Sequence, residues 1–189
     1  MTDFTKMHWL NEPPEARVSA DSLEISTAEA SDFWQKTYYG FTPDSGHALL
    51  TPAPAEFTAT LSFVGDYDAL YDQAGIMLRA GPELWIKAGV EMSDGQAQFS
   101  VVITNGQSDW STTPLASRGP VDLRLTRMGD ALFVQYRQGE SHYRMARLAP
   151  FPADASAEIG PTACSPKRAG FQARFTDFTL GPLTSRDIH

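Results

Sequence analysis

Apolar and polar positions alternate strictly from Leu84 to Met92, the clearest structural signal in the chain. Strict alternation predicts a β-strand with one core-facing side, because successive side chains of a strand point to opposite faces. Asp94-Gly95 follows, a pair suited to the positive φ angles of a tight hairpin turn, so a second strand is expected from Ala97 to Thr104. The apolar face comprises Leu84, Ile86, Ala88 and Val90, and the opposite face comprises Trp85, Lys87, Gly89 and Glu91.

The same pattern recurs along most of the chain. Asn105-Gly106 is a second hairpin signal, and a third strand is predicted from Trp110 to Leu115. About a dozen short strands at regular spacing are typical of a two-sheet sandwich or a barrel, so we predict an all-β fold. The other expected strands are Glu56–Phe63, Gly75–Arg79, Val121–Thr126, Ala131–Gln138, Tyr143–Leu148 and Phe171–Thr176, and short helical turns are expected at Ser31–Lys36 and Pro52–Glu56.

The bulk composition fits one globular domain. The chain has 189 residues, 42% of them hydrophobic, which is enough to bury a sizeable core. Its 14 glycines and 13 prolines favour short strands joined by turns over long helices. No repeat or linker is visible, so we expect a single domain over residues 1–189, with its core between about Met7 and Pro182.

Charge and motif content argue against several classes of function. The formal net charge is −8 and the basic residues are scattered, which argues against a nucleic-acid partner. Neither a long apolar run nor a secretory signal is visible, so no membrane association is expected. Cys164 is the single cysteine, which suits a reducing cytoplasm, and we interpret it as a small buried side chain. With no nucleotide motif and four dispersed histidines, neither cofactor nor metal is expected, although a structural calcium and the oligomeric state stay open.

Four clusters near residues 33–40, 70–75, 85–91 and 108–111 combine aromatic and polar side chains. A sandwich has no structural need to place Trp, Lys and Glu together on the outer face of one strand. Such clusters suggest a recognition surface. The candidate ligand-binding residues are Trp34, Tyr39, Tyr71, Asp72, Gln73, Trp85, Lys87, Glu91, Asp109 and Trp110.

These clusters also resemble those of a known family. The blocks that carry the resemblance are, in chain order, Trp9–Pro13, Phe33–Phe41, Tyr71–Gly75, Trp85–Glu91, Ser108–Ser111 and Gly160–Pro166. In this order they are similar to the DUF1349 family, whose members are often labelled "regulation of enolase" proteins. The resemblance covers nearly the whole chain. It implies a concanavalin A-like jelly-roll sandwich of two antiparallel sheets, one of them concave, and it implies no reaction.

We interpret the clusters as a binding surface for a carbohydrate or a small carbohydrate-derived metabolite on the concave face. Aromatic faces pack against the C–H side of a sugar ring, and polar groups bind its hydroxyls. Trp85 and Trp110 are expected to stack on the ligand and Lys87 to meet an anionic group. Asp72, Gln73 and Glu91 are expected to bind hydroxyls.

Each candidate also has a purely structural interpretation. Trp34 and Trp85 are consistent with packing residues on a strand surface. Lys87 and Glu91 fit an ion pair on one strand face. Asp72 and Asp109, as well as the tyrosines, fit groups that hydrogen-bond within turns or within the packed surface.

Two other functions remain open. The same patch would suit a protein-interaction module that regulates a metabolic enzyme, since aromatic clusters also form protein interfaces. A glycosidase-like hydrolase would use Glu91, but needs a second carboxylate facing it. Asp94 lies in the predicted turn and does not share that face, so a partner would have to be Asp72 or Asp109 on another strand. We therefore assign no catalytic residue from the sequence.

Overall fold

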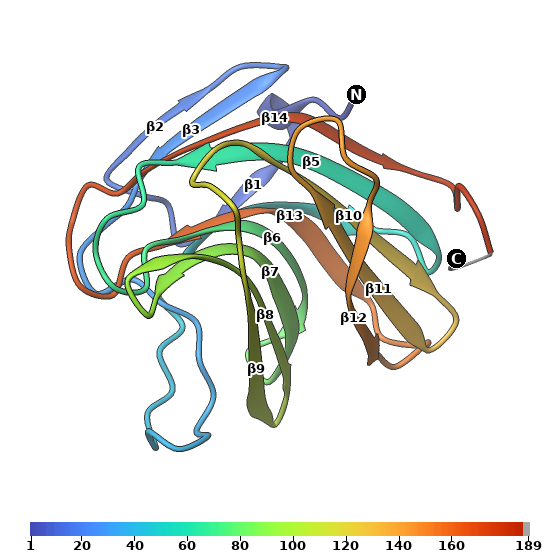
Figure 1. Cartoon of the computed structure of the whole chain (residues 1–189). Helices are drawn as coiled ribbons and strands as arrows, with labels where there is room; N and C mark the ends of the chain where they lie inside the picture. Colours follow the sequence, from blue (N-terminus) through green and yellow to red (C-terminus); the bar gives the residue numbers. More distant parts are fainter. Residues whose placement is uncertain (187–189) are drawn as a thin grey trace.

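The computed structural model describes residues 1–186, which form two antiparallel seven-stranded sheets (Figure 1). Sheet A has the order β1 (His8–Leu10), β4 (His47–Ala53), β13 (Ala157–Cys164), β6 (Gln73–Gly81), β7 (Leu84–Ser93), β8 (Gln96–Asn105) and β9 (Gln107–Pro114). Sheet B has the order β12 (Arg144–Pro150), β11 (Ala131–Arg137), β10 (Val121–Met128), β5 (Phe57–Gly65), β14 (Gln172–Gly181), β3 (Ser22–Ser26) and β2 (Glu15–Val18).

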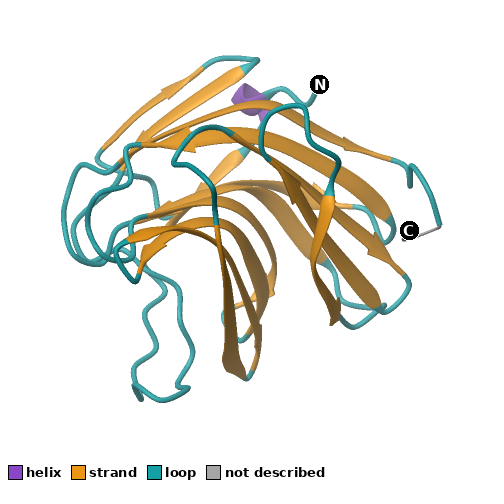
Figure 2. Cartoon of the chain, in the orientation of Figure 1, coloured by secondary structure: helices purple, strands orange, loops and turns teal. Residues whose placement is uncertain are grey.

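The prediction of an all-β jelly-roll sandwich is confirmed. Non-consecutive strands such as β6 and β13 pair at the centre of sheet A, so the chain crosses between the sheets repeatedly. Sheet B arches over sheet A, which leaves the concave face of sheet A turned away from sheet B (Figure 1). Figure 2 shows strands and loops with one short helical turn, η1 (Phe4–Lys6). Within residues 1–186 no helix is long and apolar enough to cross a membrane.

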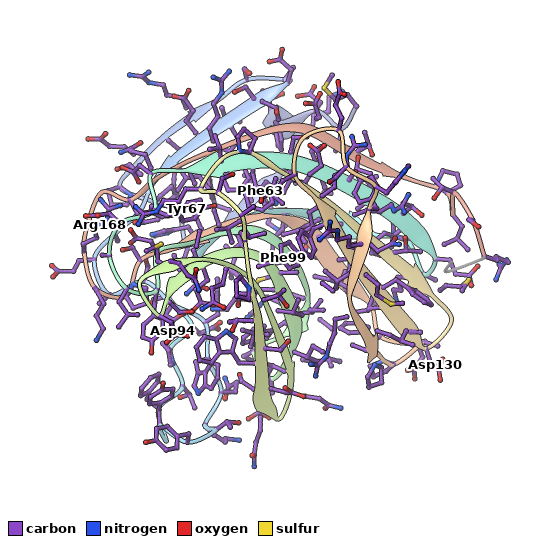
Figure 3. All side chains as sticks on the ribbon, viewed as in Figure 1. Phe63, Tyr67, Asp94, Phe99, Asp130 and Arg168 are labelled. Atoms are coloured by element: carbon purple, nitrogen blue, oxygen red, sulfur yellow. The ribbon has the colours of Figure 1, made fainter. Side chains whose placement is uncertain are left out.

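The core lies between the two sheets. Ile86, Ala88 and Val90 of β7 are buried there, as the alternation predicted. Phe63 of β5 and Phe99 of β8 project into the same space from opposite sheets (Figure 3). The two hairpins predicted at Asp94-Gly95 and Asn105-Gly106 are also confirmed, since β7 pairs with β8 and β8 with β9 around these turns.

A second apolar cluster covers part of the other face of sheet A. It forms where the loop between β3 and β4, residues 27–46, folds over that face. Cys164 is buried in this cluster, as predicted, and burial raises the pKa of its thiol to about 12. The cluster consists of Phe33, Ala48, Leu50, Met77, Trp85, Val102 and Cys164.

Five strands were not predicted and two helical turns were predicted wrongly. Strand β13 contains Pro161, which normally argues against a central strand. The ladder to β4 is interrupted at this residue, while Pro161 stays paired with Ile76 of β6. Pro52 belongs to β4 rather than to a helical turn. Around Ser31 and Phe33 the chain makes isolated bridges to Ser165 and Asp44, because tertiary pairing overrides the local preference. The strands without a prediction are β1, β2, β3, β4 and β13.

Candidate functional site

A pocket of about 240 Å³ opens on the concave face of sheet A, and we call it the concave-face pocket. Strands β6 to β9 supply its floor, and three loops supply its walls. Seven of the ten candidate residues line it: Trp34, Tyr39, Tyr71, Gln73, Lys87, Glu91 and Trp110. Asp32, Phe41, Val102, Pro166 and Lys167 complete the lining.

A buried ion pair joins the floor to the β3–β4 loop. Lys87 Nζ donates to Asp32 Oδ1 at 3.1 Å and to the carbonyl oxygen of Phe33 at 3.0 Å. Burial alone would lower the pKa of Lys87, but Asp32, Cys164 and Glu91 together outweigh this effect, and the pKa lies above its ordinary value. Lys87 therefore stays charged in the pocket, and it fixes the loop that forms one wall.

Glu91 is the second buried ionisable group on the floor, with 6% of its surface exposed. Its Oε2 accepts hydrogen bonds from Ser100 Oγ at 2.5 Å and from Trp110 Nε1 at 3.1 Å. Burial raises the pKa of Glu91 even though Lys87 and the Ser100 hydroxyl oppose the shift. The predicted ion pair between Lys87 and Glu91 is thus not a direct contact, since Lys87 bonds to Asp32 instead.

Two glycines open space beneath these charges. Gly75 of β6 lies directly opposite Gly89 of β7, and both line a small extension of the floor between Lys87 and Glu91. A Cβ atom on either glycine would come within 2.0 Å of a backbone oxygen of the neighbouring strand. The backbones of β6 and β7 can therefore lie close together at the two glycines, where side chains would prevent it. No side chain of these two residues fills this part of the floor.

Aromatic rings form the rim and walls. Trp34 meets Tyr39 edge-on with 5.7 Å between ring centroids, and Tyr39 stacks on Phe41 at 5.1 Å. On the other side Tyr71 meets Trp110 edge-on at 6.2 Å. A hydrogen bond with Tyr39, together with burial, raises the pKa of Tyr71 to about 12. Tyr71 also has a φ of 68°, a strained value for a bulky residue, which is often found at functional sites.

Three candidates lie outside the concave-face pocket. Trp85 is 1% exposed beneath Phe33, and its Nε1 donates to the carbonyl oxygen of Pro82, so stacking on a ligand does not fit its position. Asp72 is fully buried and accepts from Ser165, Arg168 and two backbone amides of its own turn. Asp109 points to Arg147 of β12, 2.7 Å away, and links the edges of the two sheets. The structural interpretation accounts for all three.

Several lining residues were not among the predicted site residues. Asp32 and Phe41 lie in the β3–β4 loop, and Pro166 and Lys167 follow β13; only Phe41 and Pro166 stand in blocks that carry the family resemblance. None of them stands in an alternating segment, so periodicity could not place them on this face. In the part of the chain that is described, no group of three or more His, Cys, Asp or Glu side chains is arranged to hold a metal ion.

The fold and this site define a class: a concanavalin A-like β-sandwich with an aromatic-walled pocket on its concave sheet. Residues 9–183 match the family described as "Protein of unknown function (DUF1349)". The chain belongs to this family. It is 40% identical over 189 residues to "Regulation of enolase protein 1" of Saccharomyces cerevisiae, an alignment that covers all of this chain and 96% of that protein.

Solved structures agree with this assignment. A functionally unknown protein from Saccharomyces cerevisiae superposes with a TM-score of 0.92 at 41% identity, over 96% of this chain and all of that one. The GH43 protein BlXynB from Bacillus licheniformis gives a TM-score of 0.63 at 14% identity, over 89% of this chain and 38% of that one. The CBM2 module of an evolved Dit protein from Lactobacillus casei BL23 phage J-1 gives 0.63 at 12% identity, over 94% and 92%. The last two likenesses show the fold alone.

Proposed function

We propose that the protein binds a monosaccharide or a small sugar-derived metabolite in the concave-face pocket, in the cytoplasm. The observation that carries the proposal is the combination of aromatic walls with a polar, buried floor. Aromatic rings suit the C–H faces of a sugar, and fixed charges suit its hydroxyls. A volume of about 240 Å³ suits a ligand the size of one sugar ring.

The floor of the pocket is preorganised for a sugar-like ligand. Lys87 and Glu91 are already held by Asp32, Ser100 and Trp110, so little ordering is needed on binding. Buried ionisable groups of this kind contribute little to stability compared with apolar residues of the same size. Their place on the floor of a pocket therefore favours a role in recognition.

A thermal-shift screen against neutral sugars, sugar acids and sugar phosphates tests the proposal. A ligand present at a hundred times its dissociation constant stabilises a protein by about 2.7 kcal/mol. We expect a shift in the wild type that is lost in Trp110→Ala and kept in Tyr38→Ala, because Tyr38 is 94% exposed and does not line the pocket. A panel that shifts nothing contradicts the proposal.

A second candidate function, a module that regulates a metabolic enzyme, is favoured by one observation. Tyr38, Tyr39 and Phe41 form an exposed aromatic group at the tip of the β3–β4 loop, and one relative is named for regulation of enolase. Exposed aromatic clusters commonly anchor protein interfaces. Here Tyr38→Ala should weaken capture of a protein partner while sugar binding survives, which separates this function from the first.

A further inference from the structure

The hydrogen bonds of Glu91 leave one of its oxygens free for a ligand. Both donors, Ser100 and Trp110, bind Oε2. No hydrogen bond among residues 1–186 uses Oε1, although Glu91 lines the concave-face pocket. When the carboxyl group is neutral, its proton therefore belongs on Oε1, because Oε2 already accepts two hydrogen bonds. Burial favours that neutral form by raising the pKa of the group.

Asp32 supplies a second carboxyl group to the pocket. Its Oδ1 accepts hydrogen bonds from Lys87 Nζ and from the amide of Phe33, while its Oδ2 accepts none within the described chain. Gln73 is a neighbour of both Asp32 and Glu91. Gln73 Nε2 is 3.4 Å from Asp32 Oδ1, and Gln73 is the direct partner of Glu91 in the β6–β7 ladder. The salt bridge from Lys87 assigns Asp32 the role of proton acceptor and leaves Glu91 as the proton donor, a pairing that is usual in acid–base chemistry.

The burial of these carboxyl groups and the size of the pocket restrict the class of reaction that the pocket can support. Glu91 and Lys87 are buried on the floor, whereas Tyr39 and Phe41 at the rim are about half exposed. A glycosidase places its two carboxyl groups around a bond to a leaving sugar, whereas the concave-face pocket, at about 240 Å³, suits a ligand of one sugar ring. A reaction in which the ligand loses no fragment fits this geometry better than hydrolysis does.

We propose that the concave-face pocket catalyses ring opening and closure of a reducing monosaccharide and so interconverts its two anomers. This inference rests on the proposed sugar-binding function. Asp32 Oδ2 takes the proton of the anomeric hydroxyl, and the electron pair of that O–H bond forms the carbonyl. The bond between the anomeric carbon and the ring oxygen breaks, and the ring oxygen takes the proton from Glu91 Oε1.

Ring closure reverses these steps after rotation of the open aldehyde. The carbonyl oxygen regains a proton from Asp32, and the attacking hydroxyl returns its proton to Glu91. Attack on the other face of the carbonyl gives the other anomer. Neither atoms nor electrons are gained or lost overall, so no co-reactant is required.

Polarimetry of freshly dissolved α-D-glucose, α-D-galactose and α-D-xylose tests the proposal directly. We expect the equilibration rate for at least one sugar to rise in proportion to the concentration of wild-type protein. Glu91→Gln should reduce this protein-dependent rate on the order of a hundredfold, because a positioned acid contributes that much or more. Asp32→Asn should reduce it similarly. Glu140→Gln, the same exchange at an exposed turn, should keep the full rate and controls for a contaminating enzyme.

Thermal shifts with the same sugars distinguish a failure of catalysis from a failure of binding. A shift together with a rate that is lost in Glu91→Gln supports binding and catalysis. A shift without any acceleration overturns the catalytic inference and leaves the binding function intact. Acceleration that persists in Glu91→Gln also overturns it. If the wild type shows neither a thermal shift nor an acceleration, both the proposed binding function and the catalytic inference are wrong.

Discussion

Lys87 Nζ lies 3.1 Å from Asp32 Oδ1 and connects strand β7 to the loop that walls the concave-face pocket. Both groups are largely buried, and the loop also carries Phe33, which packs on Trp85. Removing one member of a buried ion pair leaves the other member buried without its partner. The pair therefore helps to hold the loop against the sheet.

We expect Lys87→Met to lower the free energy of unfolding by about 3 kcal/mol, because it leaves the Asp32 carboxylate unpaired. The double variant Lys87→Met/Asp32→Asn should recover part of this loss. Urea denaturation of the wild type, both single variants and the double variant measures the coupling. Strictly additive losses would show that the pair does not act as a unit.

Glu91 should make stability depend on pH. Its pKa is raised in the folded state, so the folded protein binds the proton more tightly than the unfolded chain. The stabilisation is complete below the ordinary glutamate pKa of about 4.3 and is lost as pH rises through the folded-state value. We expect the free energy of unfolding of the wild type, relative to Glu91→Gln, to fall as pH rises from acidic to neutral. Equal slopes for the two proteins would contradict this assignment.

Asp72 should act in the opposite direction. Burial works against its ionisation, but hydrogen bonds from Arg168, Ser165 and two backbone amides hold its pKa below the ordinary value. Its contribution is therefore present above the ordinary aspartate pKa, about 3.9, and is lost as pH falls through the folded-state value. Asp72→Asn should cost about 3 kcal/mol at pH 7 and progressively less in acid, as measured by urea titrations at several pH values. A cost that does not change with pH would show that the carboxylate charge is not what stabilises this turn.

The paired glycines give a test of the floor. Gly75→Ala and Gly89→Ala should each destabilise the protein by about 3 kcal/mol or more, because the added methyl group meets neighbouring backbone that cannot move aside. Gly81→Ala is the matched control in the same strand as Gly75, since nothing lies within 4 Å of the added atom there. Thermal unfolding of the three variants compares them. A loss in Gly81→Ala as large as in Gly75→Ala would mean that crowding is not the cause.

Strict alternation predicted which face of strand β7 each side chain occupies. Lys87 and Glu91 were therefore expected on one surface, and both line the concave-face pocket. It could not predict what covers the surface, because the covering loop is positioned by contacts between residues distant in sequence. Asp32 reaches the floor only through such contacts, and Lys167 lines the pocket from the turn after β13. Alternation gives the face of a residue, and burial on that face depends on the rest of the chain.

Trp85 and Trp110 illustrate this difference and give the last prediction. Both lie on the concave face, but Trp85 is sealed beneath Phe33 whereas Trp110 is 36% exposed at the pocket. Trp85→Ala should lower the free energy of unfolding by about 4 kcal/mol, since it leaves a large cavity in the second apolar cluster. Trp110→Ala should cost less and should remove the ligand-induced thermal shift. If Trp85→Ala instead left stability unchanged and abolished ligand binding, the loop would have to open in solution and Trp85 would belong to the site.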